Sequence, residues 1–237
     1  MKALSELVDR NEPGWPLVKE WLTTARNQVV VLDAAVRARE EALVRLQVTS
    51  RSPLGAIALE TGGLVVDGGW MRVLGAEGPM QGIVGWNMLD REGADPAVPG
   101  AMLVGHDAMG GFFALNGGKW RTSIGAVFYW GQDSLEWLDL GVGYSGWLQW
   151  LLQSDLDQFY SELRWPDWRA EVALLQPDEG IAVYPFLWAS EGGPVGKRKR
   201  SPVPMRELWD LSHDMAEQLI QLPKGATVRV KLDKPLA

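Results

Sequence analysis

Hydrophobic residues near the N-terminus recur at the spacing of amphipathic helices. Residues 4–8 place Leu and Val on one face of a short predicted helix. A second helix is predicted to begin near Gly14, and a third follows Asp33 with charged residues on one side and apolar residues on the other. The apolar stretch at 27–32 is too short for a helix of its own and is predicted to be a connector.

The next segment combines a helix-capping signal with a tight turn. Ser52 is predicted to cap a helix whose first residue is Pro53, and Gly62 follows its C-terminal end. Asp67-Gly68-Gly69 then separates two apolar runs within residues 64–74. This pattern predicts a β-hairpin.

The rest of the chain alternates short strands, glycine-rich turns and helices. Residues 75–100 are rich in Gly and Pro and are predicted to form a long surface loop, tacked down by Trp86 and Met88. A polar loop is predicted over 192–200, and the alternating tail from Thr227 is interpreted as a terminal strand or a flexible end. The other predicted elements are strands over 101–104, 112–115, 126–130 and 180–188, and helices beginning at Ser134, Ser145, Asp155 and Pro204.

This order of elements predicts an α+β fold. Short turns between strands favour an antiparallel sheet, here of about four to six strands, flanked by N-terminal and C-terminal helices. We expect a single domain over 1–237, with a helical region at 1–50, an α+β core at 51–155, a helical and strand extension at 156–222 and a tail at 223–237.

Composition narrows the class of protein. Hydrophobic residues make up 46% of the chain, enough to bury a substantial core, and there is no cysteine for a disulfide or a zinc–thiolate site. No apolar run reaches the roughly 18 residues of a membrane helix, and acidic residues interrupt the N-terminus where a signal peptide would be apolar. We therefore expect a cytoplasmic protein that does not contact a membrane.

The charge and the tryptophan content bear on partners. The net charge of −7 disfavours nucleic acid and suits a partner protein with a basic surface, although solubility alone also explains an acidic chain. Thirteen tryptophans are expected mostly in the core, with a few marking a contact surface.

Catalytic chemistry is sparsely represented. The chain has two histidines, His106 and His213, and no nucleophile, zinc-binding or phosphate-loop motif. His106 adjoins Asp107, but neighbouring strand residues point to opposite faces, which weakens an acid–base pair. We predict no cofactor, no metal and no catalytic residue, and we interpret the Gly-Gly pairs as turns.

Polar and aromatic residues around the predicted hairpin turns are the candidate binding residues. Self-bonded turn side chains are the alternative explanation for the Asp and Asn members of this set. The candidates are Asp67, Trp70, Arg72, Trp86, Asp107, Asn116 and Trp120.

Two resemblances follow from specific stretches. LVGHDAMGGFFALNGG…GAVFYW at 103–130, followed by YSGWLQWL at 144–151, resembles the SUKH superfamily. That resemblance implies a small α+β domain with an antiparallel sheet, and a role in protein–protein binding, with many members thought to be immunity proteins that neutralise toxins. The long helical start, the 75–100 loop and the extension past 160 depart from that pattern.

The chain as a whole resembles a bacterial family known only as a domain of unknown function. The stretches that carry this resemblance are EPGWPLVKEW, TSRSPLGAIALETGGLVVDGGWMRVLG, LDQFYSELRWPDW and YPFLW, and it spans residues 1 to about 220. It implies no established activity.

Three functions follow from these observations. The first is a non-catalytic protein-binding module, in its finer form a toxin-immunity protein. The second is a small-ligand-binding protein or hydrolase-like enzyme that uses a cleft at His106 and Asp107, an idea that fails if His106 points into the core. The third is a structural homodimer.

Overall fold

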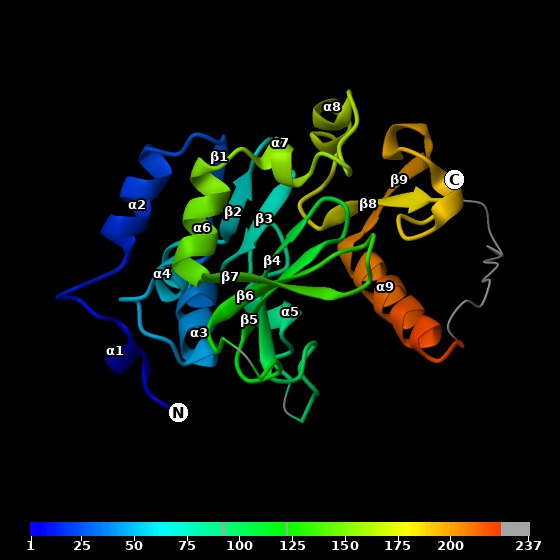
Figure 1. Cartoon of the computed structure of the whole chain (residues 1–237). Helices are drawn as coiled ribbons and strands as arrows, with labels where there is room; N and C mark the ends of the chain where they lie inside the picture. The colour runs from blue at the N-terminus through cyan, green and yellow to red at the C-terminus, as the bar shows by residue number, and fades with distance from the viewer. Residues whose placement is uncertain (92, 122, 224–237) are drawn as a thin grey trace.

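The main feature of the computed structural model, which describes residues 1–91, 93–121 and 123–223, is a seven-stranded antiparallel sheet (Figure 1). The order of strands across the sheet follows their order in the chain. The strands are β1 (Val29–Leu32), β2 (Gly63–Val66), β3 (Met71–Leu74), β4 (Ala101–Asp107), β5 (Phe112–Asn116), β6 (Ala126–Trp130) and β7 (Trp137–Gly143).

A second, two-stranded antiparallel sheet lies near the C-terminal end of the described chain. It pairs β8 (Glu179–Tyr184) with β9 (Lys199–Pro204). The hydrogen bond from the Ile181 amide to the Ala108 carbonyl, 2.7 Å long, ties β8 to the turn after β4.

Helices surround the main sheet. The four in the N-terminal quarter are α1 (Leu4–Leu7), α2 (Trp15–Thr23), α3 (Val36–Leu46) and α4 (Pro53–Glu60). The later ones are α5 (Ile83–Trp86), α6 (Tyr144–Gln153), α7 (Leu156–Phe159), α8 (Trp168–Val172) and α9 (Met205–Ile220), with 3-10 turns at Ser190–Gly192 and Val195–Lys197.

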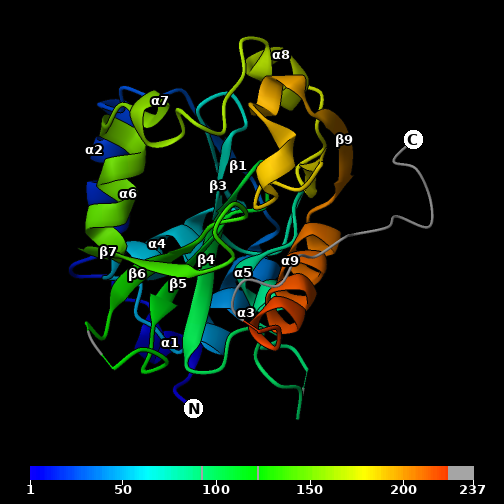
Figure 2. The same ribbon diagram turned by 45° about the vertical axis from the view of Figure 1, so that its right-hand side comes forward.

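The two faces of the sheet are covered by different helices, with α6 and α7 on one side and α5 and α9 on the other (Figure 2). On the first face, Trp147 of α6 packs on Phe113, with ring centroids 5.3 Å apart. On the second face, Trp209 of α9 packs on Phe112 at 4.6 Å. Because Phe112 and Phe113 are neighbours on β5, their side chains point to opposite faces, and both faces are buried.

The local signals in residues 52–74 are confirmed. The Ser52 hydroxyl accepts a hydrogen bond from the Gly55 amide at 3.0 Å, with Pro53 as the first residue of α4. Asp67, Gly68 and Gly69 all have positive φ and form the turn between β2 and β3. The α+β class and the antiparallel sheet are likewise confirmed.

The predicted number of strands was too low, because three strands lie in segments assigned otherwise. The connector at 27–32 is β1, an edge strand paired with β2. Residues 137–143 are β7, although a short helix was predicted from Ser134 through Leu138. Residues 199–204 are β9, although a polar loop was predicted to run through Arg200. The sequences of β7, an edge strand, and of β9, in the two-stranded sheet, lack the apolar pattern of a central strand. Edge strand β1 is apolar throughout but is only four residues long.

The predicted surface loop at 75–100 is largely an interior segment over its first half. Met80, Ile83, Val84 and Trp86 are buried, and α5 lies within it. Trp86 and Met88 were the two residues expected to anchor this segment. The predicted tail strand from Thr227 lies outside the described residues.

Candidate functional site

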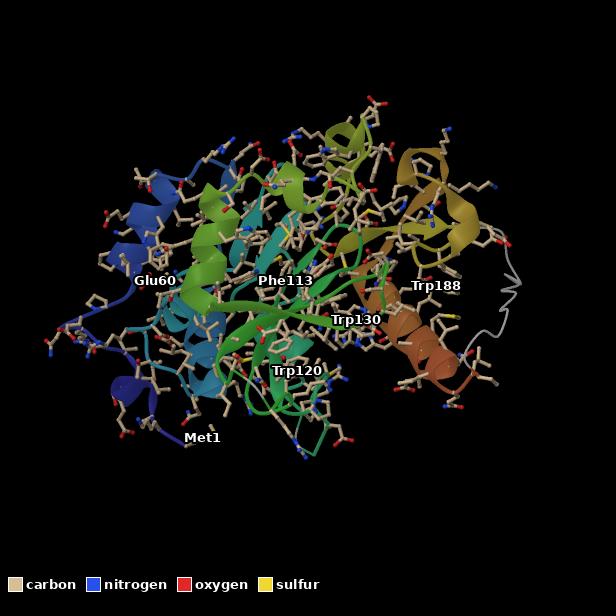
Figure 3. The ribbon with its side chains drawn as sticks, viewed as in Figure 1. Met1, Glu60, Phe113, Trp120, Trp130 and Trp188 are labelled. Carbon is tan, nitrogen blue, oxygen red and sulfur yellow. The ribbon has the colours of Figure 1, made fainter. Side chains whose placement is uncertain are left out.

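The seven candidate residues do not converge on one site. The turn before β3 carries Asp67 and Trp70, and the end of β4 carries Asp107. Asn116 and Trp120 lie at another turn, near Phe128 and at a distance from Trp188 (Figure 3). Arg72 and Trp86 belong to the interior of the sheet face that α5 and α9 cover.

Asp67 and Trp70 hold the segment after α7 against the β2–β3 turn. The Asp67 carboxylate accepts hydrogen bonds from Arg164 at 2.5 Å and from Arg169 at 3.2 Å. The Arg164 guanidinium also lies 4.6 Å from the centroid of the Trp70 ring and 4.1 Å from that of Trp168. These contacts are those of a structural clamp, because every charge in it has a partner within the chain.

Asp107 organises the β4–β5 turn from the opposite sheet face to His106. Its Oδ1 accepts hydrogen bonds from the amides of Met109 and Gly111, and its Oδ2 accepts one from the Tyr129 hydroxyl at 2.8 Å. Burial raises the pKa of the Asp107 carboxyl, and these hydrogen bonds oppose the shift. The turn interpretation of Asp107 fits this geometry.

Asn116 likewise organises the next turn, between β5 and β6, through hydrogen bonds from its side chain to the backbone. Its Oδ1 accepts hydrogen bonds from the amides of Gly118 and Trp120, and its Nδ2 donates to the Trp120 carbonyl. The Trp120 ring stacks on Phe128 with centroids 3.9 Å apart. The hydrogen bonds of Asn116 and the stacking of Trp120 on Phe128 together hold the turn between β5 and β6.

Arg72 and His106 form a buried pair of a different kind. They are direct partners across β3 and β4, so their side chains share one face of the sheet, and they are 2% and 0% exposed. Nε and Nη1 of Arg72 and both ring nitrogens of His106 have no hydrogen-bond partner among the described residues. Burying a charge without a partner costs several kcal/mol, so this arrangement is energetically unfavourable as it stands.

Burial and charge fix the protonation states of this pair. Burial lowers the pKa of Arg72 to about 10, which leaves the guanidinium charged at neutral pH. Burial, reinforced by the Arg72 charge, holds the pKa of His106 well below its ordinary value, so the imidazole is neutral. His106 points into the core and shares no cleft with Asp107, which lies on the other face.

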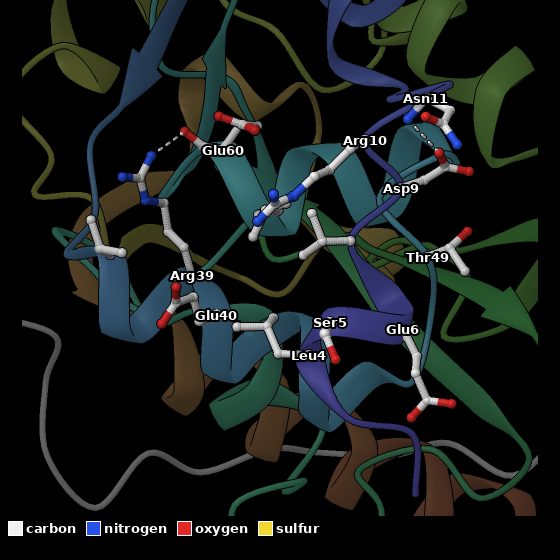
Figure 4. A pocket seen from close by; sticks show the side chains of 13 residues that line it. Leu4, Ser5, Glu6, Asp9, Arg10, Asn11, Arg39, Glu40, Thr49 and Glu60 are labelled. Carbon is white, nitrogen blue, oxygen red and sulfur yellow. Dashed lines mark hydrogen bonds between the residues drawn. The ribbon is translucent and has the colours of Figure 1, made fainter.

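A groove at the N-terminal end of the molecule is a site that the sequence did not indicate. It has a volume of about 1030 Å³ and lies between the N-terminal segment, α3 and α4 (Figure 4). Its apolar lining is Leu4, Val8, Val36 and Leu59, and its charged lining is Glu6, Asp9, Arg10, Arg39, Glu40 and Glu60.

Two of the groove's carboxylates are unengaged in the described chain. The side chains of Glu40 and Glu60 make no hydrogen bond or ion pair there, whereas Glu6 and Asp9 accept backbone amides of their own turn. The Arg39 guanidinium donates to the Glu60 carbonyl at 3.1 Å, so its charge is directed to the wall of the groove. In the sequence, these acidic residues look the same as those on the solvent-exposed face of any surface helix.

The described residues contain neither a metal site nor a membrane-spanning helix. Within residues 1–91, 93–121 and 123–223, His, Asp and Glu side chains nowhere gather in threes as a metal site requires. In the same ranges, every helix is too short or too polar to cross a bilayer.

The fold and these sites define an α+β protein built on an antiparallel meander, with a charged groove at its N-terminal end. The chain belongs to the family described as protein of unknown function DUF2625, which matches residues 4–208. No solved structure matches the chain.

Two relatives extend over most of the chain. The uncharacterised protein YbfG of Escherichia coli (strain K12) is 36% identical over 223 residues, covering 93% of this chain and 100% of that protein. An uncharacterised protein of Haemophilus influenzae is 30% identical over 205 residues, covering 86% of this chain and 90% of that protein. The expected membership of an uncharacterised family with bacterial relatives is thereby confirmed.

Proposed function

We propose that the protein is a non-catalytic binding module of the cytoplasm, and that its N-terminal groove binds a basic segment of a partner protein. The observation that carries this proposal is the pair of unengaged carboxylates, Glu40 and Glu60, beside the apolar side chains of Leu4 and Val36. A segment that combines Lys or Arg with an apolar residue would meet both kinds of lining.

Charge favours this occupant over an acidic or a nucleic-acid partner. The groove is lined by four acidic and two basic side chains, and one of the basic pair, Arg39, is hydrogen-bonded to the groove wall. The net charge of −7 adds a long-range attraction for basic partners, which raises association rates more than it raises affinity.

The SUKH-like stretch at 103–130 supplies a finer form of the proposal. If that resemblance reflects common function, the partner is a toxin and the protein is its immunity factor. The resemblance implies an antiparallel sheet flanked by helices, and the antiparallel main sheet of this chain supports the proposal to that extent.

The alternatives receive less support from the geometry. An enzyme that uses His106 and Asp107 together requires both side chains in one cleft, and they lie on opposite sheet faces with no exposure.

A homodimer has one observation in its favour, the edge strand β1, where Val30 and Val31 are 49% and 45% exposed. A dimer mass by light scattering that reverts to a monomer in a Val31→Lys variant would support that alternative.

A displayed library of random peptides tests the groove directly. We expect selection on the intact protein to enrich peptides with Lys or Arg beside an apolar residue, and the Glu40→Lys/Glu60→Lys variant to lose them. The matched control is Glu162→Lys/Glu217→Lys, which changes the net charge equally at exposed positions outside the groove. Absence of enrichment, or equal binding by both double variants, would reject the groove as the binding site.

A further inference from the structure

The sheet face beneath α5 and α9 carries a cluster of unpartnered nitrogen donors. Its members are Arg72, His106 and Trp86 of α5. The Trp86 ring centroid lies 5.8 Å from that of His106. Trp86 is 1% exposed, and its Nε1–H also lacks a hydrogen-bond partner among the described residues. Three neighbouring buried side chains thus present N–H groups that nothing in the described chain accepts.

The cluster is also positively charged, and no carboxylate of the described chain forms an ion pair with Arg72. The carboxylates that act on Arg72 are Asp107, across the sheet, and Asp178 and Glu179, at the start of β8. None of the three is within ion-pair distance of Arg72 in the described chain. A second guanidinium, that of Arg206 on α9, lies 4.0 Å from the centroid of the Trp86 ring and adds to the positive charge.

The chemistry of these donors defines the kind of group that they would bind. It must be an acceptor, because the unpartnered groups are the Arg72 guanidinium, the Trp86 indole N–H and one N–H of neutral His106. It must be anionic, because a charge stays in an interior at acceptable cost only when it is paired. A planar carboxylate matches the fork of a guanidinium and leaves lone pairs for the other donors.

The surroundings restrict its size. Phe112 and Trp209 complete the enclosure, and both are buried, as are Arg72, His106 and Trp86. We propose that Arg72, His106 and Trp86 form a buried site for a small monocarboxylate of the size of formate or acetate. This site is separate from the N-terminal groove, and neither proposal depends on the other.

Ligand-dependent stability is the first test. We expect the Tm of the protein to rise saturably with sodium formate or acetate, at constant ionic strength set with chloride, and not with succinate. The rise should vanish in Arg72→Met and should weaken in Arg72→Lys, which keeps the charge and loses the fork. Arg39→Met is the matched control, because its buried Nε is also unpartnered but lies outside the cluster, and it should respond like the wild type.

The indole N–H signals locate the binding. In ¹⁵N-labelled protein, formate should move the Trp86 resonance, identified by its loss in Trp86→Phe. The signal of Trp15, on α2 at the other side of the molecule from α9, should stay in place (Figure 1). A response unchanged in Arg72→Met, or no saturable response to either carboxylate, would overturn the proposal. So would a crystal structure grown in formate that shows only ordered water between Arg72 and His106.

Discussion

Arg164 and Asp67 are joined by a 2.5 Å ion pair between positions 97 residues apart in the chain. Their side chains are only 6% and 10% exposed, and the rings of Trp70 and Trp168 lie against the guanidinium. The pair fastens the segment between α7 and α8 to the β2–β3 turn. It contrasts with Arg72 of β3, which is also buried but forms no ion pair within the described chain.

Removing Arg164 should therefore be costly. We expect Arg164→Met to lower the free energy of unfolding by about 3 kcal/mol, because it leaves Asp67 buried with only the exposed Arg169 as partner. Urea denaturation measures the change. Arg51→Met is the control, because its pair with Glu12 is mostly exposed and should contribute less than about 1 kcal/mol. Equal losses in the two variants would contradict the clamp.

Removing Arg72 should have the opposite sign. In chloride buffer without carboxylates, Arg72→Met should raise the free energy of unfolding by about 1–4 kcal/mol, since it replaces an unpaired buried charge by an apolar chain of similar length. The same urea titration gives the answer. Destabilisation as large as that of Arg164→Met would mean that Arg72 has a strong partner within the chain.

His106 should make the fold sensitive to mild acid. Its folded-state pKa is depressed by burial and by Arg72, so the unfolded chain takes up a proton near pH 6.5 while the folded chain does not. The contribution of His106 to the free energy of unfolding is fully present above pH 6.5. It is lost as the pH falls below 6.5, so that the free energy of unfolding drops by about 2 kcal/mol between pH 7 and pH 5.

The His106→Phe variant isolates this effect. It should lose about 2 kcal/mol less than the wild type over that interval, measured by urea denaturation at the two pH values. His213, which is only partly buried, also has a lowered pKa, so His213→Phe should recover a smaller part. Asp107, whose raised pKa acts in the opposite direction, is present in every variant and cancels. Parallel pH profiles for wild type and His106→Phe would show that His106 takes up its proton in the folded state.

Gly111 should tolerate no side chain. A Cβ there would lie 2.3 Å from Oδ2 of Asp107 and 2.4 Å from the Tyr129 hydroxyl, which displaces the hydrogen bond between them. We expect Gly111→Ala to cost about 1–3 kcal/mol of unfolding free energy. Gly143→Ala is the matched control, because φ there is −79° and the nearest atom lies at 3.4 Å. A near-neutral Gly111→Ala would show that the turn has room to adjust.

Local signals in the sequence predicted local structure well. Ser52 and Pro53 specify the start of α4 through a cap and a fixed φ, and Asp67-Gly68-Gly69 specifies the hairpin through positive φ. Both depend on a few adjacent residues and need no information from elsewhere in the chain.

Structure that depends on distant neighbours was missed. Gly75 and Gly82 suggest a loop, yet each is a site of close backbone approach, with a Cβ falling 2.3 Å from the Gly63 amide and 2.5 Å from the Glu77 amide. None of the seven residues of strand β7 is buried, and Leu138 is exposed, so the strand character of this segment comes from pairing with β6.

The candidate residues show the same division. Arg72 and Trp86 were selected because they lie near turns, but what distinguishes them, burial without a hydrogen-bond partner, arises only when α5 and α9 cover the sheet. The partner of Asp67, Arg164, is 97 residues away, and no spacing rule connects the two. The groove acids, Glu40 and Glu60, carry no distinguishing pattern at all.

The agreement between strand order and chain order has a consequence for synthesis. Each strand from β2 to β7 can pair with one that has already left the ribosome, so the sheet can grow from its N-terminal edge with few long-range closures. Helix α9, at 205–220, is made after the last of these strands. The face that holds Arg72 and His106 is thus completed last, and an anion present in the cell has access to it until the C-terminal helix docks.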